Sequence, residues 1–180
     1  MANSKALYFL ALVPPNEVKE EIRQIKLEIK EKYDASHALK LPAHITIIPP
    51  FRLEKQQEGD IFKKLKLISS FQAGFTVKLK NFGHFGQRVI FIEVENPQPV
   101  MDIYTKAKTY LPSCFSNPED SSLHPHITLA TRDLKKDKFK EAWQEFKTRT
   151  YSGSFEAISL LLFKHNGKSW DIYKEFSFNL

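Results

Sequence analysis

Apolar residues recur along the chain with two different periods, and the changes of period predict its elements. A continuous apolar run at about 6–13 predicts a first buried strand, closed by Pro14-Pro15. Across 16–33, apolar residues follow three- and four-residue spacing with Glu and Lys between them, which predicts an amphipathic helix. A second strand is expected at 44–48, stopped by Pro49-Pro50 because proline donates no ladder hydrogen bond.

The rest of the chain alternates between the same two patterns. Runs of period two predict strands with one wet face, and runs of period 3.6 predict helices with one apolar face. We therefore expect helices at 60–69, 97–111 and 139–146, strands at 75–80, 89–94, 124–130, 155–163 and 170–178, turns at 81–87 and 165–168, and a polar loop at 112–122.

The second half of the chain repeats the first at a nearly constant offset. His44 and His126 lie 82 positions apart, and the same offset relates Pro15 to Pro97. A tandem β-α-β-α-β-β unit follows, with copies at about 5–94 and 88–178. No low-complexity linker separates the copies, so we expect residues 1–180 to form a single bilobal α+β domain with an internal pseudo-two-fold axis.

Two matching strand segments carry the candidate chemistry, His44-Ile-Thr-Ile47 and His126-Ile-Thr-Leu129. Side chains alternate along a strand, so His and Thr share one face of each strand while the aliphatic residues enter the core. A pseudo-two-fold axis can bring these two polar faces into one cleft. The expected site therefore holds His44 and His126 with Thr46 and Thr128.

Two imidazoles and two hydroxyls suit the cleavage of a phosphodiester. Histidine titrates near neutral pH, so a neutral ring can take a proton from water while a protonated ring donates to the departing ribose oxygen. The threonine hydroxyls can hydrogen-bond the non-bridging phosphoryl oxygens and hold the phosphorus in line. Nothing in this chemistry requires a metal or another cofactor.

The duplicated His-x-Thr strands, the Pro-Pro-Phe after the first of them and the chain length resemble the two-histidine (2H) phosphoesterase superfamily, above all its bacterial 2'-5' RNA ligase-like proteins. The resemblance implies two antiparallel sheets around a central cleft. It also implies metal-independent cyclic phosphodiesterase chemistry on 2',3'-cyclic phosphates or 2'-5' linkages of a nucleotide or RNA, with 2'-5' ligation as the reverse reaction. In that resemblance His44, Thr46, His126 and Thr128 are the motif residues, and the acid and base roles stay unassigned.

Three further residues are weaker substrate-binding candidates. Arg132 follows the second motif, where relatives often carry a basic residue, and a plain surface arginine is the alternative. Phe51 could form an aromatic wall for a base, and core packing is the alternative. Tyr8 on the first strand could line the cleft, although a core tyrosine is the ordinary outcome.

Other functions fit parts of the same pattern. His124-Pro-His126 has the spacing of a zinc-ligand pair, although no third ligand is recognisable nearby. A net charge of +6 and an aromatic content of 13% also suit a non-catalytic nucleotide- or RNA-binding module on the same fold. In a third alternative, the cleft serves a protein partner and the paired motifs are accidental.

Cysteine content and the apolar runs indicate where the protein is located. The one cysteine, Cys114, excludes an internal disulfide and is expected to be a buried hydrophobe. No apolar run reaches the roughly 20 residues that a membrane-spanning helix needs, and the apolar run after Lys5 lacks a small-x-small cleavage site. We therefore expect a cytoplasmic monomer that does not bind a membrane.

Overall fold

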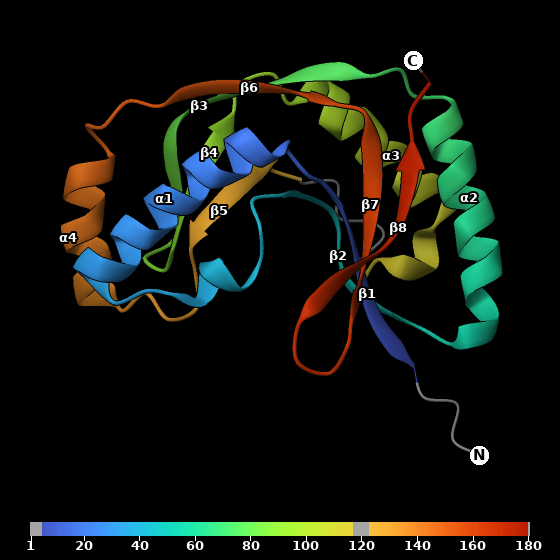
Figure 1. Ribbon diagram of the computed structural model, residues 1–180, viewed down its shortest axis with the longest axis horizontal. Helices are drawn as coiled ribbons and strands as arrows, with labels where there is room; N and C mark the ends of the chain where they lie inside the picture. The colour runs from blue at the N-terminus through green and yellow to red at the C-terminus, as the bar shows by residue number, and fades with distance from the viewer. Residues whose placement is uncertain (1–4, 117–122, 180) are drawn as a thin grey trace.

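The computed structural model describes residues 5–116 and 123–179. Strands and helices alternate through most of this part of the chain, as the two periods of the sequence predict (Figure 1). The elements are β1 (Ala6–Leu12), α1 (Asn16–Tyr33), β2 (Ile45–Leu53), α2 (Glu58–Ser70), β3 (Phe75–Phe85), β4 (Val89–Val94), α3 (Gln98–Tyr110), β5 (His126–Ala130), α4 (Lys136–Phe146), β6 (Ser152–Ala157), β7 (Ser159–His165) and β8 (Trp170–Ser177), with 3₁₀ turns at His37–Lys40, Lys55–Gln57 and Pro112–Cys114.

The described strands form one antiparallel sheet in the order β6-β3-β4-β5-β2-β1-β7-β8. Two four-stranded halves meet in its middle, where β2 and β5 pair at Ile45 and Ile127. The α+β, antiparallel fold class is thus confirmed, with the two expected sheets joined edge to edge at this pairing. Counted outwards from the centre, β2, β1 and β7 on one side correspond to β5, β4 and β3 on the other. This order agrees with the duplication, which itself stays a prediction.

The four helices pack in two pairs on the two halves of the sheet. Helix α1 contacts β5, β6 and α4, while α3 contacts β2 and α2. Figure 1 shows α1 and α4 on one side of the molecule and α2 and α3 on the other. Their buried apolar faces, such as Ile22, Ile25 and Ile29 of α1, share one core with the helix-facing side of the sheet. None of the helices described is both long and apolar enough to cross a membrane.

Pro49-Pro50 does not stop the second strand, contrary to our prediction. Strand β2 continues to Leu53, and the register with β1 shifts between the pairs Tyr8–Phe51 and Leu10–Ile48. Both prolines are exposed in this irregular stretch. A bulge leaves backbone groups outside the regular ladder, so it tolerates residues that have no N–H.

The strand predicted at 155–163 is two strands that belong to different halves of the sheet. β6 pairs with β3, whereas β7 pairs with β1, and Ile158 lies between them. A continuous apolar pattern cannot show that the chain changes partner, because partner choice is a long-range property. The crossing ties the C-terminal segment to both halves.

The turn predicted at 81–87 is shorter than expected, because β3 continues to Phe85. Asn81 adopts a left-handed conformation with φ 55°, and the register with β4 shifts there. Asparagine tolerates this region better than most residues. Its side-chain carbonyl oxygen also accepts a hydrogen bond from the Tyr151 backbone at 3.2 Å. The predicted polar loop at 112–122 begins as a 3₁₀ turn with Cys114 buried, as expected; its residues 117–122 lie outside the described part of the chain.

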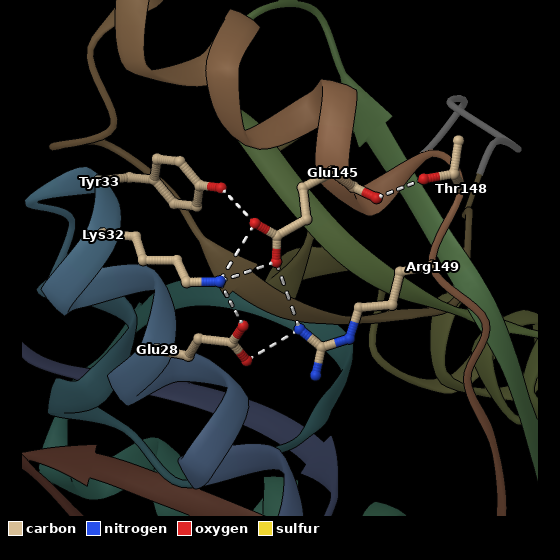
Figure 2. Close-up of polar contacts among 6 residues, drawn as sticks. All are labelled: Glu28, Lys32, Tyr33, Glu145, Thr148 and Arg149. Carbon is tan, nitrogen blue, oxygen red and sulfur yellow. Dashed lines mark hydrogen bonds and ion pairs between the residues drawn. The ribbon is translucent and has the colours of Figure 1, made fainter.

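A cluster of ion pairs and hydrogen bonds fastens α1 to the end of α4 (Figure 2). The Glu145 carboxylate accepts from the Tyr33 hydroxyl at 2.8 Å and from Lys32 at 3.2 Å. Arg149 donates to Glu28 at 2.8 Å. Burial opposes ionisation of Glu28, but the hydrogen bonds from Arg149 and Lys32 outweigh it and hold the pKa of Glu28 below its ordinary value. These contacts join residues more than a hundred positions apart.

Replacing Glu145 by Gln tests this cluster. The change removes the central charge, and we expect the free energy of unfolding to fall by about 1 kcal/mol and Tm by roughly 2–4 °C. Glu141→Gln is the matched control, because Glu141 pairs with Lys138 within the same helix. Urea unfolding measures both variants. Equal losses in the two would show that the cluster adds nothing between the helices.

Candidate active site

Strand alternation places the four motif residues on the face of the sheet that turns away from the helices. In β2 and at the residue just before it, the buried Ile45 and Ile47 alternate with the half-buried His44 and Thr46. In β5 the same alternation holds for His126-Ile-Thr-Leu129. Burying the aliphatic side chains in the core therefore forces each His-Thr pair to the opposite surface.

The central pairing of the sheet brings these two surfaces together. Ile45 faces Ile127 across antiparallel strands, and this register sets His44 opposite Thr128 and Thr46 opposite His126. The two histidines are then diagonal neighbours, a relation in which residues typically lie roughly 7–8 Å apart and their Cβ atoms somewhat closer. The residues predicted as a site thus come from adjacent strands and share one face.

Both histidine rings are anchored in the same way. Nδ1 of His44 donates to the carbonyl of Pro42 at 2.8 Å, and Nδ1 of His126 donates to the carbonyl of His124 at 2.6 Å. A carbonyl oxygen can only accept, so the proton of each neutral ring is on Nδ1. Nε2 of each ring has no hydrogen-bond partner among the described residues. Each ring therefore offers Nε2 to a ligand.

The electrostatic surroundings keep His44 neutral. Burial lowers its pKa to about 4; the carbonyl of Pro42 opposes this shift, and the positive charges of Lys26 and His126 add to it. The mutual effect of the two histidines is expected for rings that share one site. At neutral pH the Nε2 lone pair of His44 is therefore available as a base.

The charges around His126 differ from those around His44. Burial lowers its pKa and a charge on His124 adds to the shift, while the His124 carbonyl and the negative charge of Glu93 oppose it. Glu93 is directly across the β4–β5 ladder from His126, and its carboxylate accepts a hydrogen bond from Nε2 of His124 at 2.8 Å. Of the two catalytic candidates, His126 is the one that has a carboxylate beside it.

An aromatic ring supports each histidine. The Phe9 ring on β1 lies 5.3 Å from the His44 ring, and the Phe91 ring on β4 lies 4.8 Å from the His126 ring, both between centroids. Phe9 also stacks on Phe163 at 4.4 Å. Such contacts fix ring orientation and exclude water from one side of each imidazole.

The Phe91 ring that contacts His126 lies close to a glycine. Gly83 of β3 pairs with Phe91 of β4, and an added Cβ there would collide with the Phe91 ring and the Glu93 carboxylate. Because Gly83 has no side chain, the Phe91 ring and the Glu93 carboxylate can lie this close to its backbone.

The threonine hydroxyls are available to a ligand. Thr46 and Thr128 are both half-buried, and neither hydroxyl has a hydrogen-bond partner within the described residues. A hydroxyl can donate one hydrogen bond and accept two. Together with the two Nε2 atoms, these groups form a set that a phosphoryl group could satisfy.

Tyr8 and Phe51 are not part of this site, contrary to our hypotheses for them. Their rings stack at 6.0 Å in the core on the helix-facing side of the sheet. Tyr8 donates a hydrogen bond to Glu58 there. Burial disfavours the Glu58 carboxylate, but hydrogen bonds from Tyr8, Lys55, Lys164 and Tyr173 outweigh it and lower the pKa of Glu58 to about 2. Glu58 is therefore a buried carboxylate with its hydrogen-bond partners supplied, and it lies against the half of the sheet that contains β1.

Arg132 stays a prediction. It is exposed in the loop after β5, with a left-handed backbone at φ 61°. Its positive charge contributes to the lowered pKa of His37, after the effect of burial. The adjacent Asp133 accepts hydrogen bonds from the backbone of Ser36 and His37 at 2.8 and 2.7 Å. The loop that carries Arg132 is therefore attached to the segment before β2.

The zinc alternative is not favoured by the surroundings of His124. Its Nε2 is engaged by Glu93, and the His124 and His126 ring centroids are 6.2 Å apart. No group of three His, Cys, Asp or Glu side chains in the described part of the chain has the geometry to hold a metal ion. Metal-independent chemistry stays a prediction.

Sequence reasoning missed three residues of the site, Phe9, Phe91 and Glu93. A signal for two of them was present, because Phe9 and Phe91 are 82 positions apart, as are the two motif histidines. Glu93 had no such signal, since its counterpart at that offset is Ala11. Only the ladder register reveals that Glu93 faces His126.

Comparison with known proteins identifies the family to which this fold and the paired His-x-Thr strands belong. Residues 14–169 match the 2'-5' RNA ligase superfamily, so the chain belongs to that family. Curated relatives named as candidate phosphoesterases from Geobacillus kaustophilus and Bacillus licheniformis are 24% and 25% identical over 173 residues, which is 94% of this chain and 94% and 96% of theirs. These relatives support a phosphoesterase function.

Solved structures agree on the fold. The apo form of Escherichia coli LigT has a TM-score of 0.67 at 17% identity, over 98% of this chain and 99% of that one. A protein from Thermus thermophilus also has a TM-score of 0.67, at 16% identity over 95% and 97% of the two chains. LigT has also been solved with 3'-AMP, with NADP+ and with ATP.

Nitrogen-15 NMR of the histidine rings tests the site geometry. We expect both neutral rings to carry their proton on Nδ1, because a carbonyl accepts from each. The titration midpoint of His44 is expected near pH 4, well below the ordinary value of about 6.5. His44→Gln and His126→Gln assign the signals. An Nε2-protonated neutral ring at either position would contradict the anchoring described.

Proposed function

We propose that the protein is a metal-independent phosphodiesterase that acts on 2',3'-cyclic phosphates or 2'-5' linkages of nucleotides or RNA by acid–base catalysis with His44 and His126. The observation that carries the proposal is the matched anchoring of the two rings, which leaves Nε2 of each without a partner among the described residues. Two such nitrogens on one face, with two available hydroxyls beside them, fit a reaction that takes one proton and gives another.

The proposed hydrolysis uses each histidine once. Neutral His44 takes a proton from water at Nε2 as the water oxygen bonds to phosphorus. The bond from phosphorus to one ribose oxygen breaks, and protonated His126 gives its Nε2 proton to that oxygen. A phosphomonoester results, and proton exchange with solvent restores both rings. In ligation, a ribose 5'-hydroxyl attacks the phosphorus of the cyclic phosphate in place of water, one ring P–O bond breaks and a 2'-5' linkage forms. Cleavage of a 2'-5' linkage to the cyclic phosphate is the reverse of that step.

The charges beside the rings favour this assignment of roles. Glu93 stabilises a cationic His126, whereas Lys26 destabilises a cationic His44. An acid–base pair needs one ring protonated and one neutral, so the unequal fields favour the productive protonation state. The phosphodiester itself is an anion and strengthens protonation of the ring beside it.

Thr46 and Thr128 are proposed to hold the phosphoryl group. Thr46 is opposite His126 in the ladder, and Thr128 is opposite His44. In each pair, a hydroxyl and an Nε2 atom can therefore contact the same phosphoryl group. Hydrogen bonds to the non-bridging oxygens strengthen as charge develops in the transition state. Nucleotide complexes of LigT give independent support for a nucleotide ligand.

Removing either histidine tests the acid–base proposal. We expect His44→Ala and His126→Ala each to lower kcat on a 2',3'-cyclic nucleotide by about 10²–10⁴-fold. His84→Ala is the matched control, because His84 packs on Trp143 at 4.5 Å, away from the motif strands. Product isomers are identified by chromatography, and the rate is expected not to change with a chelator present. Substantial turnover by either site variant would contradict the mechanism.

A different result would favour the binding module. Wild-type protein that binds nucleotide or RNA in a salt-dependent way but turns over no cyclic or 2'-5'-linked substrate would identify it as non-catalytic. Loss of turnover on chelation, restored by zinc, would instead support a metal site that includes His124 and His126.

The pH–rate profile of Glu93→Gln tests the assigned roles. Activity falls on the alkaline side as the acid loses its proton, and Glu93 raises the pKa of His126. Removing that charge is therefore expected to move the alkaline limb to lower pH than in wild type. Glu156→Gln, on the edge strand β6, is the control. If only the acidic limb moved, His126 would be the base and His44 the acid.

A further inference from the structure

A cavity of about 450 Å³ lies between the first half of α1 and the segment 39–43 that leads into β2. One side is a stripe of α1 that contains Asn16, Lys19, Arg23 and Lys26. These positions follow helical spacing, so their side chains lie along one face of the helix. The other side is the chain that precedes His44.

Among the residues that line the cavity, Lys26 is a buried charge. Its residue is only 3% exposed, and its ammonium donates to the carbonyls of Ala38 and Leu41 at 3.0 and 3.2 Å. No carboxylate pairs with it in the described part of the chain. Burial lowers the pKa of Lys26 to about 8, which still leaves most of it charged at pH 7. Buried charges ordinarily have a counter-ion, and this one lacks it.

The other charges of the cavity are mostly positive. Lys19 and Arg23 add two cations. Glu20 is the acidic residue of the wall, and it pairs with Arg23 at 3.3 Å. Three cations against one carboxylate give the cavity a positive field. The unpaired N–H groups of the first turn of α1 add to that field at Asn16.

The cavity is next to the catalytic candidates. Its wall includes Pro42 and Ala43, the two residues before His44, and the Pro42 carbonyl is the acceptor for the His44 ring. The charge of Lys26 acts on His44 strongly enough to contribute to its lowered pKa. The cavity therefore adjoins the segment that carries and anchors the His44 ring.

We propose that this cavity binds a phosphate group of the substrate other than the one being cleaved. Its three cations and its buried ammonium without a counter-ion suit a phosphate, which offers several strong acceptor oxygens. The physiological substrate then carries at least two phosphates, as a 5'-phosphorylated nucleotide or an oligonucleotide end does. This inference rests on the proposed function for the cleaved bond, while the cavity itself can be tested without turnover.

The test compares two substrates in three proteins. The substrates are adenosine 2',3'-cyclic phosphate and the same molecule with a 5'-phosphate; the measured quantity is the ratio of their kcat/KM values. The proteins are wild type, Lys19→Gln/Arg23→Gln, and the control Lys63→Gln/Lys66→Gln, which removes the same charge from exposed positions of α2. We expect wild type to prefer the 5'-phosphorylated substrate by about tenfold or more, and the cavity variant to lose most of that preference.

A binding measurement separates this inference from the proposed function. Calorimetry compares adenosine 5'-phosphate with adenosine on the same three proteins, and needs no turnover. Weaker binding of the 5'-phosphate, by about tenfold, in the cavity variant alone supports the phosphate site even if no cyclic phosphate is cleaved. Equal binding by the cavity variant and the control, or a wild-type enzyme indifferent to the 5'-phosphate, overturns it. Absence of turnover with intact binding overturns the proposed reaction only.

Discussion

The pairing of Ile45 with Ile127 is the constraint on which the candidate site depends. It joins the two halves of the sheet, and it sets the register of the two motif strands. Because both isoleucines are fully buried, their neighbours His44, Thr46, His126 and Thr128 must face the other way. A slip of one residue in either strand would turn the two motif side chains of that strand into the core. Hydrophobic burial of two side chains therefore determines the positions of four polar ones.

The two histidine rings have matching contacts but different charges around them. Each histidine donates to the carbonyl two residues before it and packs on a phenylalanine of the neighbouring strand. The charges differ, since Glu93 stands where the other half has Ala11, and Lys26 has no acidic partner among the described residues. Equal geometry positions two identical rings, and unequal charge lets them hold different protonation states. A fully symmetric site would supply no such preference.

Strand periodicity predicted that the four motif residues share the face opposite the core, because alternation is a local property that each strand carries in its own sequence. The same rule argues against Phe51, which shares odd-numbered positions with the buried Ile45 and Ile47. Tyr8 was harder to place, since every residue from Tyr8 to Leu12 is buried and both faces of β1 look alike. The division of 155–163 into β6 and β7, and the proximity of Glu93 to His126, depend on which strands pair. Such long-range choices leave no periodic trace in one sequence.

Lys26 links the proposed phosphate cavity to catalysis. Burial is the main cause of the low pKa of His44, and the uncompensated charge of Lys26 adds to it, so the proposed base is neutral in the free protein. A phosphate bound beside Lys26 would offset that charge, so His44 would accept a proton more readily once the substrate is in place. The second phosphate would then contribute to the chemical step as well as to binding, because its effect on the base appears only in the bound complex. A substrate that lacks this phosphate would meet a weaker base, which gives the cavity a role in selecting the substrate.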